Sequence, residues 1–138
     1  MLGGHMVKSW SGNQAVIALS SGEAEYYAMV RAASVAIGLR SIMMDLGVKL
    51  KIELFTDATA AKGIGQRIGL GKVRHLETSQ LWLQQLVGDG HIRITKISTD
   101  INIADVLTKH VDQKTLRNHQ VFTNQAAMKG QHRLGLNA

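Results

Sequence analysis

One long helical segment, with a recognisable cap at each end, constrains the fold of this chain more than any other sequence feature. Residues 20–23 (SSGE) have the pattern of a capping box, in which Ser20 caps the helix and Glu23 reaches back over its first turn. Residues 24–46 are rich in Ala, Met and Leu, and Gly47 is a natural residue to end a helix. We expect this helix to pack on a sheet.

The rest of the chain alternates between strand and helix character. Residues 49–55 alternate apolar and charged side chains, as a half-buried strand does, and residues 92–97 repeat Ile at strand spacing. A short strand is also predicted for residues 5–11. Three further segments are predicted to be helical: residues 58–64, 73–87 and 102–110, the last capped by Asn102, with a glycine-rich loop over residues 63–72. This order predicts an α/β fold with a mixed or parallel sheet, although three strands make a thin sheet for such helices.

The 138 residues suit one compact domain, and helical periodicity fades after about residue 112. We therefore expect a domain over residues 1–112 and a poorly structured basic tail over residues 113–138. The hydrophobic content of 45% argues against disorder throughout. No run of about eighteen apolar residues and no secretion signal occur, so neither a membrane span nor export is expected. The lack of cysteine excludes disulfides and thiolate metal sites, which fits an intracellular protein.

The formal net charge of +6 favours a polyanionic partner, because phosphate contacts release condensed counterions. A basic surface without a partner is an equally good interpretation of the charge alone. No nucleotide-binding or nucleophile motif competes with this interpretation: in residues 66–73 a glutamine stands where a P-loop needs its first glycine, and the glycines of 63–69 do not form G-x-G-x-x-G.

Four acidic residues compete for a functional role: Glu23, Glu25, Asp57 and Asp105. Glu23 and Glu25 point roughly 200° apart on one helix, so they cannot share a site, and Glu23 already belongs to the capping box. Considered by itself, Glu25 is interpreted as a solvent-exposed acid of the helix. Asp57 follows a strand, where open α/β sheets bind ligands, but could equally cap the next helix. Asp105 could serve a helix dipole or pair with Lys109.

Taken together, the acids on the long helix, at the strand end and on the last helix suit a divalent-metal site. Hard cations such as Mg²⁺ take oxygen ligands, and neighbouring carboxylates repel one another unless a cation lies between them. Two such ions about 3.5–4 Å apart can stabilise both the attacking and the leaving oxygen of a phosphodiester. We therefore expect Glu25, Asp57 and Asp105 to bring their carboxyl groups within roughly 8 Å of one another.

Four segments also carry a family likeness. Residues 9–28, with SWS followed by VIALSSGEAEYYA, resemble the signature of copia-type retrotransposon ribonuclease H domains. Residues 55–58 (FTDA), 71–77 (GKVRHLE) and 102–109 (NIADVLTK) resemble later segments of the same domain, in the same order. Residues 78–81 depart from the family, which usually has basic and aromatic residues there. The likeness covers residues 5–110.

This resemblance implies a ribonuclease H-like mixed sheet flanked by helices, and hydrolysis of the RNA strand of an RNA–DNA hybrid with two Mg²⁺ ions. It carries three of the family's four catalytic, metal-binding carboxylates over to Glu25, Asp57 and Asp105. The family's first aspartate lies on a strand upstream of His5, and this chain starts after it, so we expect the first two strands to be absent. The implied partners are the hybrid and the rest of a polyprotein that includes reverse transcriptase.

Three functions therefore compete. The first is a metal-dependent hybrid endonuclease, which this chain alone would perform weakly or not at all. The second is a catalytically impaired remnant that only binds nucleic acid, and the third is an unrelated α/β binding module in which the acids are caps. Candidate phosphate contacts are Lys72, Arg74 and Lys96, which should give binding that weakens with salt and depends little on sequence.

Overall fold

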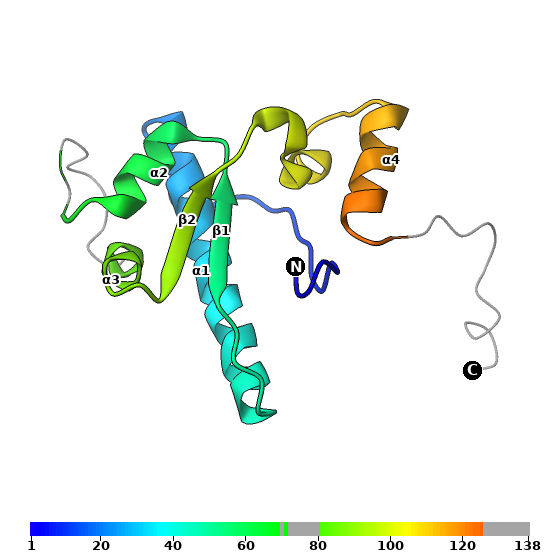
Figure 1. Cartoon of the computed structure of the whole chain (residues 1–138). Helices are drawn as coiled ribbons and strands as arrows, with labels where there is room; N and C mark the ends of the chain where they lie inside the picture. Colours follow the sequence, from blue (N-terminus) through cyan, green and yellow to red (C-terminus); the bar gives the residue numbers. More distant parts are fainter. Residues whose placement is uncertain (70, 72–80, 126–138) are drawn as a thin grey trace. The chain divides into compact units, whose positions relative to one another are not determined.

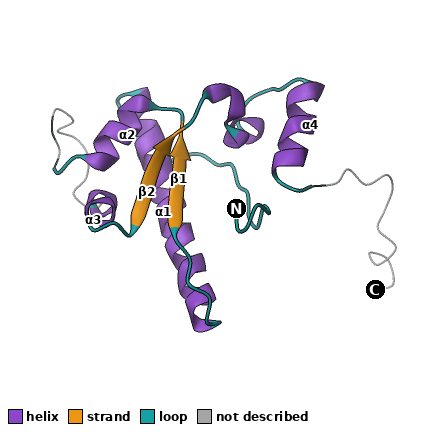
Figure 2. Cartoon of the chain, in the orientation of Figure 1, coloured by secondary structure: helices purple, strands orange, loops and turns teal. Residues whose placement is uncertain are grey.

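The computed structural model describes residues 1–69, 71 and 81–125. They belong to two compact units: a larger one over residues 13–102, and a smaller one over residues 1–12 and 103–138. The fold is mixed α/β, with a small parallel sheet of two strands in the described part of the larger unit (Figures 1 and 2). The coarse α/β prediction is confirmed.

The long helix α1 (Ser21–Asp45) begins and ends where its caps predict. The Ser20 hydroxyl accepts from the Glu23 amide at 3.2 Å, and the Glu23 carboxylate accepts from the Leu19 amide at 2.9 Å. The reciprocal bond thus reaches one residue further back than a standard capping box. At the other end Gly47 has φ +81°, and the Val48 amide donates to Met43 at 2.8 Å, which is the Schellman arrangement.

By length and composition alone, α1 is also able to cross a membrane. One of its 18-residue windows has a mean hydropathy of 1.2, although Arg31 and Arg40 interrupt the apolar stretch. One such helix is weak evidence for a membrane span, because the core helix of a soluble protein passes the same test. In the larger unit α1 packs on the sheet and on α2, and 22% of the window is buried.

The sheet consists of β1 (Ile52–Thr56) and β2 (Ile92–Lys96), which run parallel with Ile52 opposite Ile92 and Thr56 opposite Lys96. In β1 buried and exposed residues alternate, as the sequence predicts. Both strands are shorter than predicted, since residues 49–51 lie before β1. Ile97 lies beyond β2, yet its amide still donates to the Thr56 carbonyl at 3.0 Å and prolongs the pairing.

The described part of the larger unit also contains two shorter α-helices: α2 (Thr59–Gln66) and α3 (Trp82–Gly88). The prediction that a loop starts at residue 63 is wrong, because Gly63 and Gly65 are both helical. A Cβ on Gly65 would lie 2.6 Å from Ile94 Cδ1, so this glycine lets α2 pack closely on β2. Of the helix predicted over 73–87, residues 73–80 lie outside the described residues.

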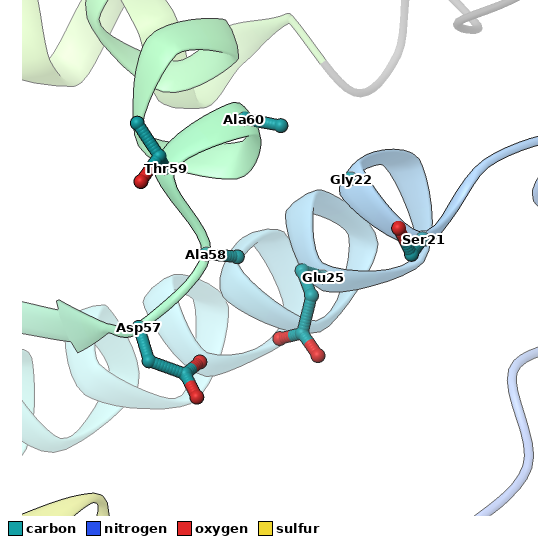
Figure 3. A pocket seen from close by; sticks show the side chains of 7 residues that line it. All are labelled: Ser21, Gly22, Glu25, Asp57, Ala58, Thr59 and Ala60. Carbon is teal, nitrogen blue, oxygen red and sulfur yellow. The ribbon is translucent and has the colours of Figure 1, made fainter. Parts of the chain in front are cut away.

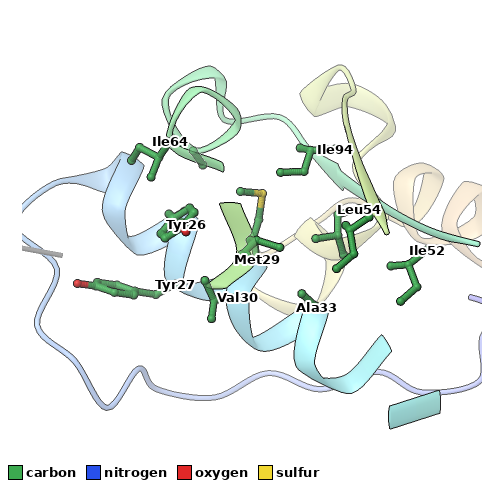
Figure 4. Packing of buried hydrophobic residues seen from close by; sticks show 12 residues of the cluster. Tyr26, Tyr27, Met29, Val30, Ala33, Ile52, Leu54, Ile64 and Ile94 are labelled. Carbon is green, nitrogen blue, oxygen red and sulfur yellow. The ribbon is translucent and has the colours of Figure 1, made fainter. Parts of the chain in front are cut away.

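The core of the larger unit lies between α1, the sheet and the two short helices (Figure 4). Tyr26, Met29 and Ala33 of α1 face the apolar side of the sheet, and Leu83 of α3 is fully buried. Its buried apolar members are Tyr26, Tyr27, Met29, Val30, Ala33, Ile52, Leu54, Ala61, Ile64, Leu83, Ile92 and Ile94. This core fixes the ends of β1 and α1 relative to each other.

The last predicted helix is replaced by two 3₁₀ turns, η2 (Thr99–Ile101) and η3 (Ile103–Leu107). Asn102 is the C-cap of η2 and directly precedes η3, so the prediction of an α-helix over residues 102–110 is wrong. The Ser98 hydroxyl caps η2 at its start. The carboxylate of Asp100 accepts from this same hydroxyl, which ties the first turn together.

The smaller unit contains a helix where no regular structure was expected. Helix α4 (Gln113–Phe122) starts at Asp112, whose carboxylate accepts from the Thr115 amide at 2.7 Å. The expectation of a structureless tail is therefore wrong for residues 113–122, and residues 126–138 lie outside the described residues. The strand predicted for residues 5–11 is also not formed; an isolated bridge joins Leu2 to His5 instead.

Candidate functional site

A pocket of about 360 Å³ opens where β1 ends and where α1 and α2 begin (Figure 3). Two carboxylates line it, and in Figure 3 the Glu25 and Asp57 side chains extend into the same space. The lining residues are Ser21, Gly22, Glu25, Asp57, Ala58, Thr59 and Ala60. The pocket therefore brings together two acids that lie far apart in the sequence, and the spacing of their carboxyl groups stays a prediction.

The Asp57 carboxylate does not cap α2. The N-cap residue is Ala58, which makes no side-chain cap bond, and the Ala58 amide donates to the Thr56 hydroxyl at 3.1 Å. Asp57 instead accepts a hydrogen bond on Oδ2 from the Thr99 hydroxyl at 3.1 Å. The structural alternative for Asp57 as an N-cap is thus wrong, and its half-buried carboxylate is directed to the pocket.

The two glutamates of α1 have separate roles, as their angular spacing predicts. Glu23 is 4% exposed and its carboxylate holds the Leu19 amide. Glu25 is exposed and lines the pocket. The start of α1 is held close to α2, because a Cβ on Gly22 would lie 2.7 Å from the Cβ of Ala60. Gly22 therefore allows the close approach that forms one wall of the pocket.

Glu25 and Asp57 are the two side chains of the pocket that could hold a cation. Two carboxylates that face one cavity repel each other, and a bound divalent cation removes that repulsion while using their oxygens as ligands. The acceptor chemistry is all oxygen, which suits Mg²⁺ better than a soft metal. In the described ranges, however, no group of three or more His, Asp or Glu residues is placed to hold a metal ion.

Asp105 lies in η3 of the smaller unit, so its distance from the pocket stays a prediction. Within that unit its carboxylate pairs with Lys109 Nζ at 2.8 Å, with 20% of the Asp105 side chain exposed. The predicted i,i+4 pair is confirmed. Since Lys109 is 57% exposed, a surface pair of this kind contributes little to stability.

Of the three predicted phosphate contacts, only one lies in the described part of the chain. Lys96 is exposed at the end of β2, whereas Lys72 and Arg74 lie outside the described residues. Sequence reasoning missed Thr99, the donor to Asp57. The sequence feature that could have identified Thr99 is its position shortly after β2. Because β2 runs parallel to β1, the residues that follow the two strands lie close together.

Comparison with known proteins identifies the class: the homologues of this chain are retrovirus-related Pol polyproteins of transposons. The chain is 31% identical over 106 residues, or 75% of its length, to the Pol polyprotein from transposon TNT 1-94 of Nicotiana tabacum. It is 26% identical over 119 residues, or 83% of its length, to those from transposons RE1 and RE2 of Arabidopsis thaliana.

The chain spans about 8% of the length of each of these polyproteins. No family model and no solved structure matches it. The predicted likeness to retrotransposon Pol polyproteins is therefore confirmed.

Proposed function

We propose that this chain is part of a ribonuclease H domain of a retrotransposon polyprotein, which hydrolyses the RNA strand of RNA–DNA hybrids. The observation that carries the proposal is the pocket shared by Glu25 and Asp57 at the carboxyl end of β1. Open α/β sheets bind ligands at this edge. The homology to Pol polyproteins supports the same function, because reverse transcription produces such hybrids.

The acids of the chain hold divalent cations in this proposal. Glu25 and Asp57 would supply carboxylate oxygens in the pocket, and Asp105 is the third carboxylate that the family resemblance implies. One oxygen of Asp57 accepts from Thr99, so the other is available to a cation. Bound Mg²⁺ would polarise the scissile phosphate and lower the pKa of the attacking water. The protein supplies placement and charge, and Lys96 with Lys72 and Arg74 would hold the phosphate backbone.

Three carboxylates are fewer than the four of the family, whose first aspartate lies on an upstream strand. A site with three carboxylates would hold divalent cations more weakly than a site with four, because each carboxylate supplies ligand oxygens and negative charge. We therefore expect the 138-residue chain to cleave hybrid poorly by itself. The same chain preceded by the upstream strands of its polyprotein should cleave the RNA strand in a Mg²⁺-dependent manner.

A hybrid-cleavage assay tests this proposal. It compares the 138-residue chain, the chain extended upstream, and the Asp57→Asn and Glu25→Gln variants of the extended protein. Asp45→Asn is the matched control, because Asp45 is an exposed acid at the opposite end of α1 from Glu25. We expect both pocket variants to lose cleavage by at least about a hundredfold while the control keeps it. Cleavage by Asp57→Asn at the parental rate would refute the site.

A remnant that only binds hybrid is the second candidate, and the net charge of +6 favours it. The same assay separates the two functions. The remnant predicts that the extended protein binds hybrid in a salt-dependent way and leaves the RNA intact.

A further inference from the structure

The end of β2 is held beside the end of β1 beyond the last paired residues of the sheet. Thr56 lies opposite Lys96, and the next amide, that of Ile97, still donates to the Thr56 carbonyl at 3.0 Å. The segments that follow the two strands therefore leave the sheet side by side. As a result, the segment that follows Ile97 passes the Asp57 side chain.

The geometry of η2 leaves the Thr99 hydroxyl available to a neighbour. Ser98 is the N-cap of this turn, and its hydroxyl accepts from the Asp100 amide and donates to the Asp100 carboxylate. The Thr99 carbonyl accepts from the Asn102 amide at 3.2 Å. The backbone around Thr99 is thus fixed by its own turn, and the hydroxyl donates to Asp57 Oδ2 at 3.1 Å.

We propose that Thr99 is a positioning residue for Asp57: its hydroxyl orients the carboxylate so that the pocket presents two acids to one cation. This inference rests on the proposed function, because it assumes that the pocket holds a divalent cation. A hydroxyl that donates to one carboxylate oxygen restricts rotation of the side chain and leaves the second oxygen as a ligand. Thr99 acts through Asp57 and has no part in the chemistry itself.

A second threonine–carboxylate pair provides a matched control, because it makes the same kind of hydrogen bond away from the pocket. Thr95 donates to the Glu53 carboxylate at 2.6 Å, from β2 to β1, across the same sequence separation of 42 positions. Neither Thr95 nor Glu53 lines the pocket. Loss of the Thr95 hydroxyl therefore reports what such a bond contributes to the sheet alone.

The test measures Mn²⁺ binding to the 138-residue chain by the loss of the free-ion electron paramagnetic resonance signal. We expect Thr99→Val to weaken binding roughly tenfold, as loss of an outer-sphere partner does, and Thr99→Ser to restore it. Thr95→Val should leave affinity unchanged, and Asp57→Asn should abolish binding. Thermal unfolding of each variant, followed by circular dichroism, checks that the substitutions leave the fold intact.

Each outcome separates the two proposals. Binding by the parent, its loss in Asp57→Asn, and unchanged affinity in Thr99→Val would overturn the role of Thr99 and leave the site standing. A Thr95→Val variant that loses as much affinity as Thr99→Val would also overturn it, because the effect would then belong to the sheet. Mn²⁺ that binds equally to the parent and to Asp57→Asn, or to neither, would overturn the cation site itself.

Discussion

The two glycines of α2 offer a sharp test of how closely this helix packs on the sheet. Gly63 and Gly65 lie in the same helix, but a Cβ on Gly63 would meet nothing within 4 Å, whereas one on Gly65 would lie 2.6 Å from Ile94 Cδ1. Changing a helical glycine to alanine gains about 1 kcal/mol of helix propensity. Gly63→Ala should therefore raise the free energy of unfolding by up to about 1 kcal/mol.

Gly65→Ala should gain the same propensity but also overpack the core. Ile94 is only 3% exposed, so its methyl group cannot move into solvent, and overpacking of this kind costs about 1–3 kcal/mol. The net change is a loss of roughly 0–2 kcal/mol, which puts Gly65→Ala about 1–3 kcal/mol below Gly63→Ala. Urea denaturation followed by far-ultraviolet circular dichroism measures this difference directly.

A double-mutant cycle identifies the cause of the difference. Ile94→Val removes the methyl group that the new Cβ would meet, at a cost of about 0.5–1.5 kcal/mol by itself. The Gly65→Ala/Ile94→Val protein should lose less free energy of unfolding than the two single variants lose together, by about 1 kcal/mol or more. Equal stability of Gly63→Ala and Gly65→Ala would refute the close packing of α2 on β2.

The next three predictions concern Tyr26, Gln84 and Lys96. Burial raises the pKa of Tyr26 to about 12, against the opposing effect of Arg67, so ultraviolet titration of a Tyr27→Phe protein should show phenolate forming near pH 12. The stability that this raised pKa represents, roughly 1–3 kcal/mol, is complete below pH 10 and is lost as the pH rises to 12; phenolate near pH 10 would contradict it. Gln84→Ala should cost about 1–3 kcal/mol in urea denaturation, because the buried amide of Gln84 bonds Ile64 and both backbone groups of Gly69; a change below about 0.5 kcal/mol would contradict that role. Lys96→Ala should reduce the slope of log affinity for hybrid against log salt by about 1 in a fluorescence-anisotropy titration, and an unchanged slope would remove Lys96 from the interface.

Local signals predicted the elements whose structure is decided locally. The caps of α1 are side-chain and glycine motifs within a few residues of the helix ends, so Ser20 and Gly47 identify both ends from the sequence. The alternation of β1 likewise reports which side chains face the core. Glycine misled the prediction at Gly65, because its packing partner Ile94 belongs to a strand that lies 29 residues further along the chain, beyond the reach of any local pattern.

The site was predictable in part, for a related reason. The pairing of Glu25 with Asp57 followed from the family resemblance and from the rule that ligands bind at the ends of parallel strands. The sequence alone could not decide between a cap and a ligand for Asp57. In the structure the Asp57 carboxylate accepts from Thr99, a residue 42 positions away, and the N-cap residue Ala58 makes no side-chain cap bond. Helix α4 was missed because only three of its ten residues are apolar, although Asp112 precedes it as an N-cap.

The parallel pairing of β1 with β2 has a consequence for the synthesis of the chain. The paired residues of these strands lie 40 positions apart, as Ile52 and Ile92 illustrate. At a translation rate of about 5–20 residues per second, roughly 2–8 s pass between the synthesis of β1 and the synthesis of β2. Its apolar Ile52 and Leu54 are unpaired during that time, and the charges of Lys51 and Glu53 that alternate with them oppose association with neighbouring nascent chains.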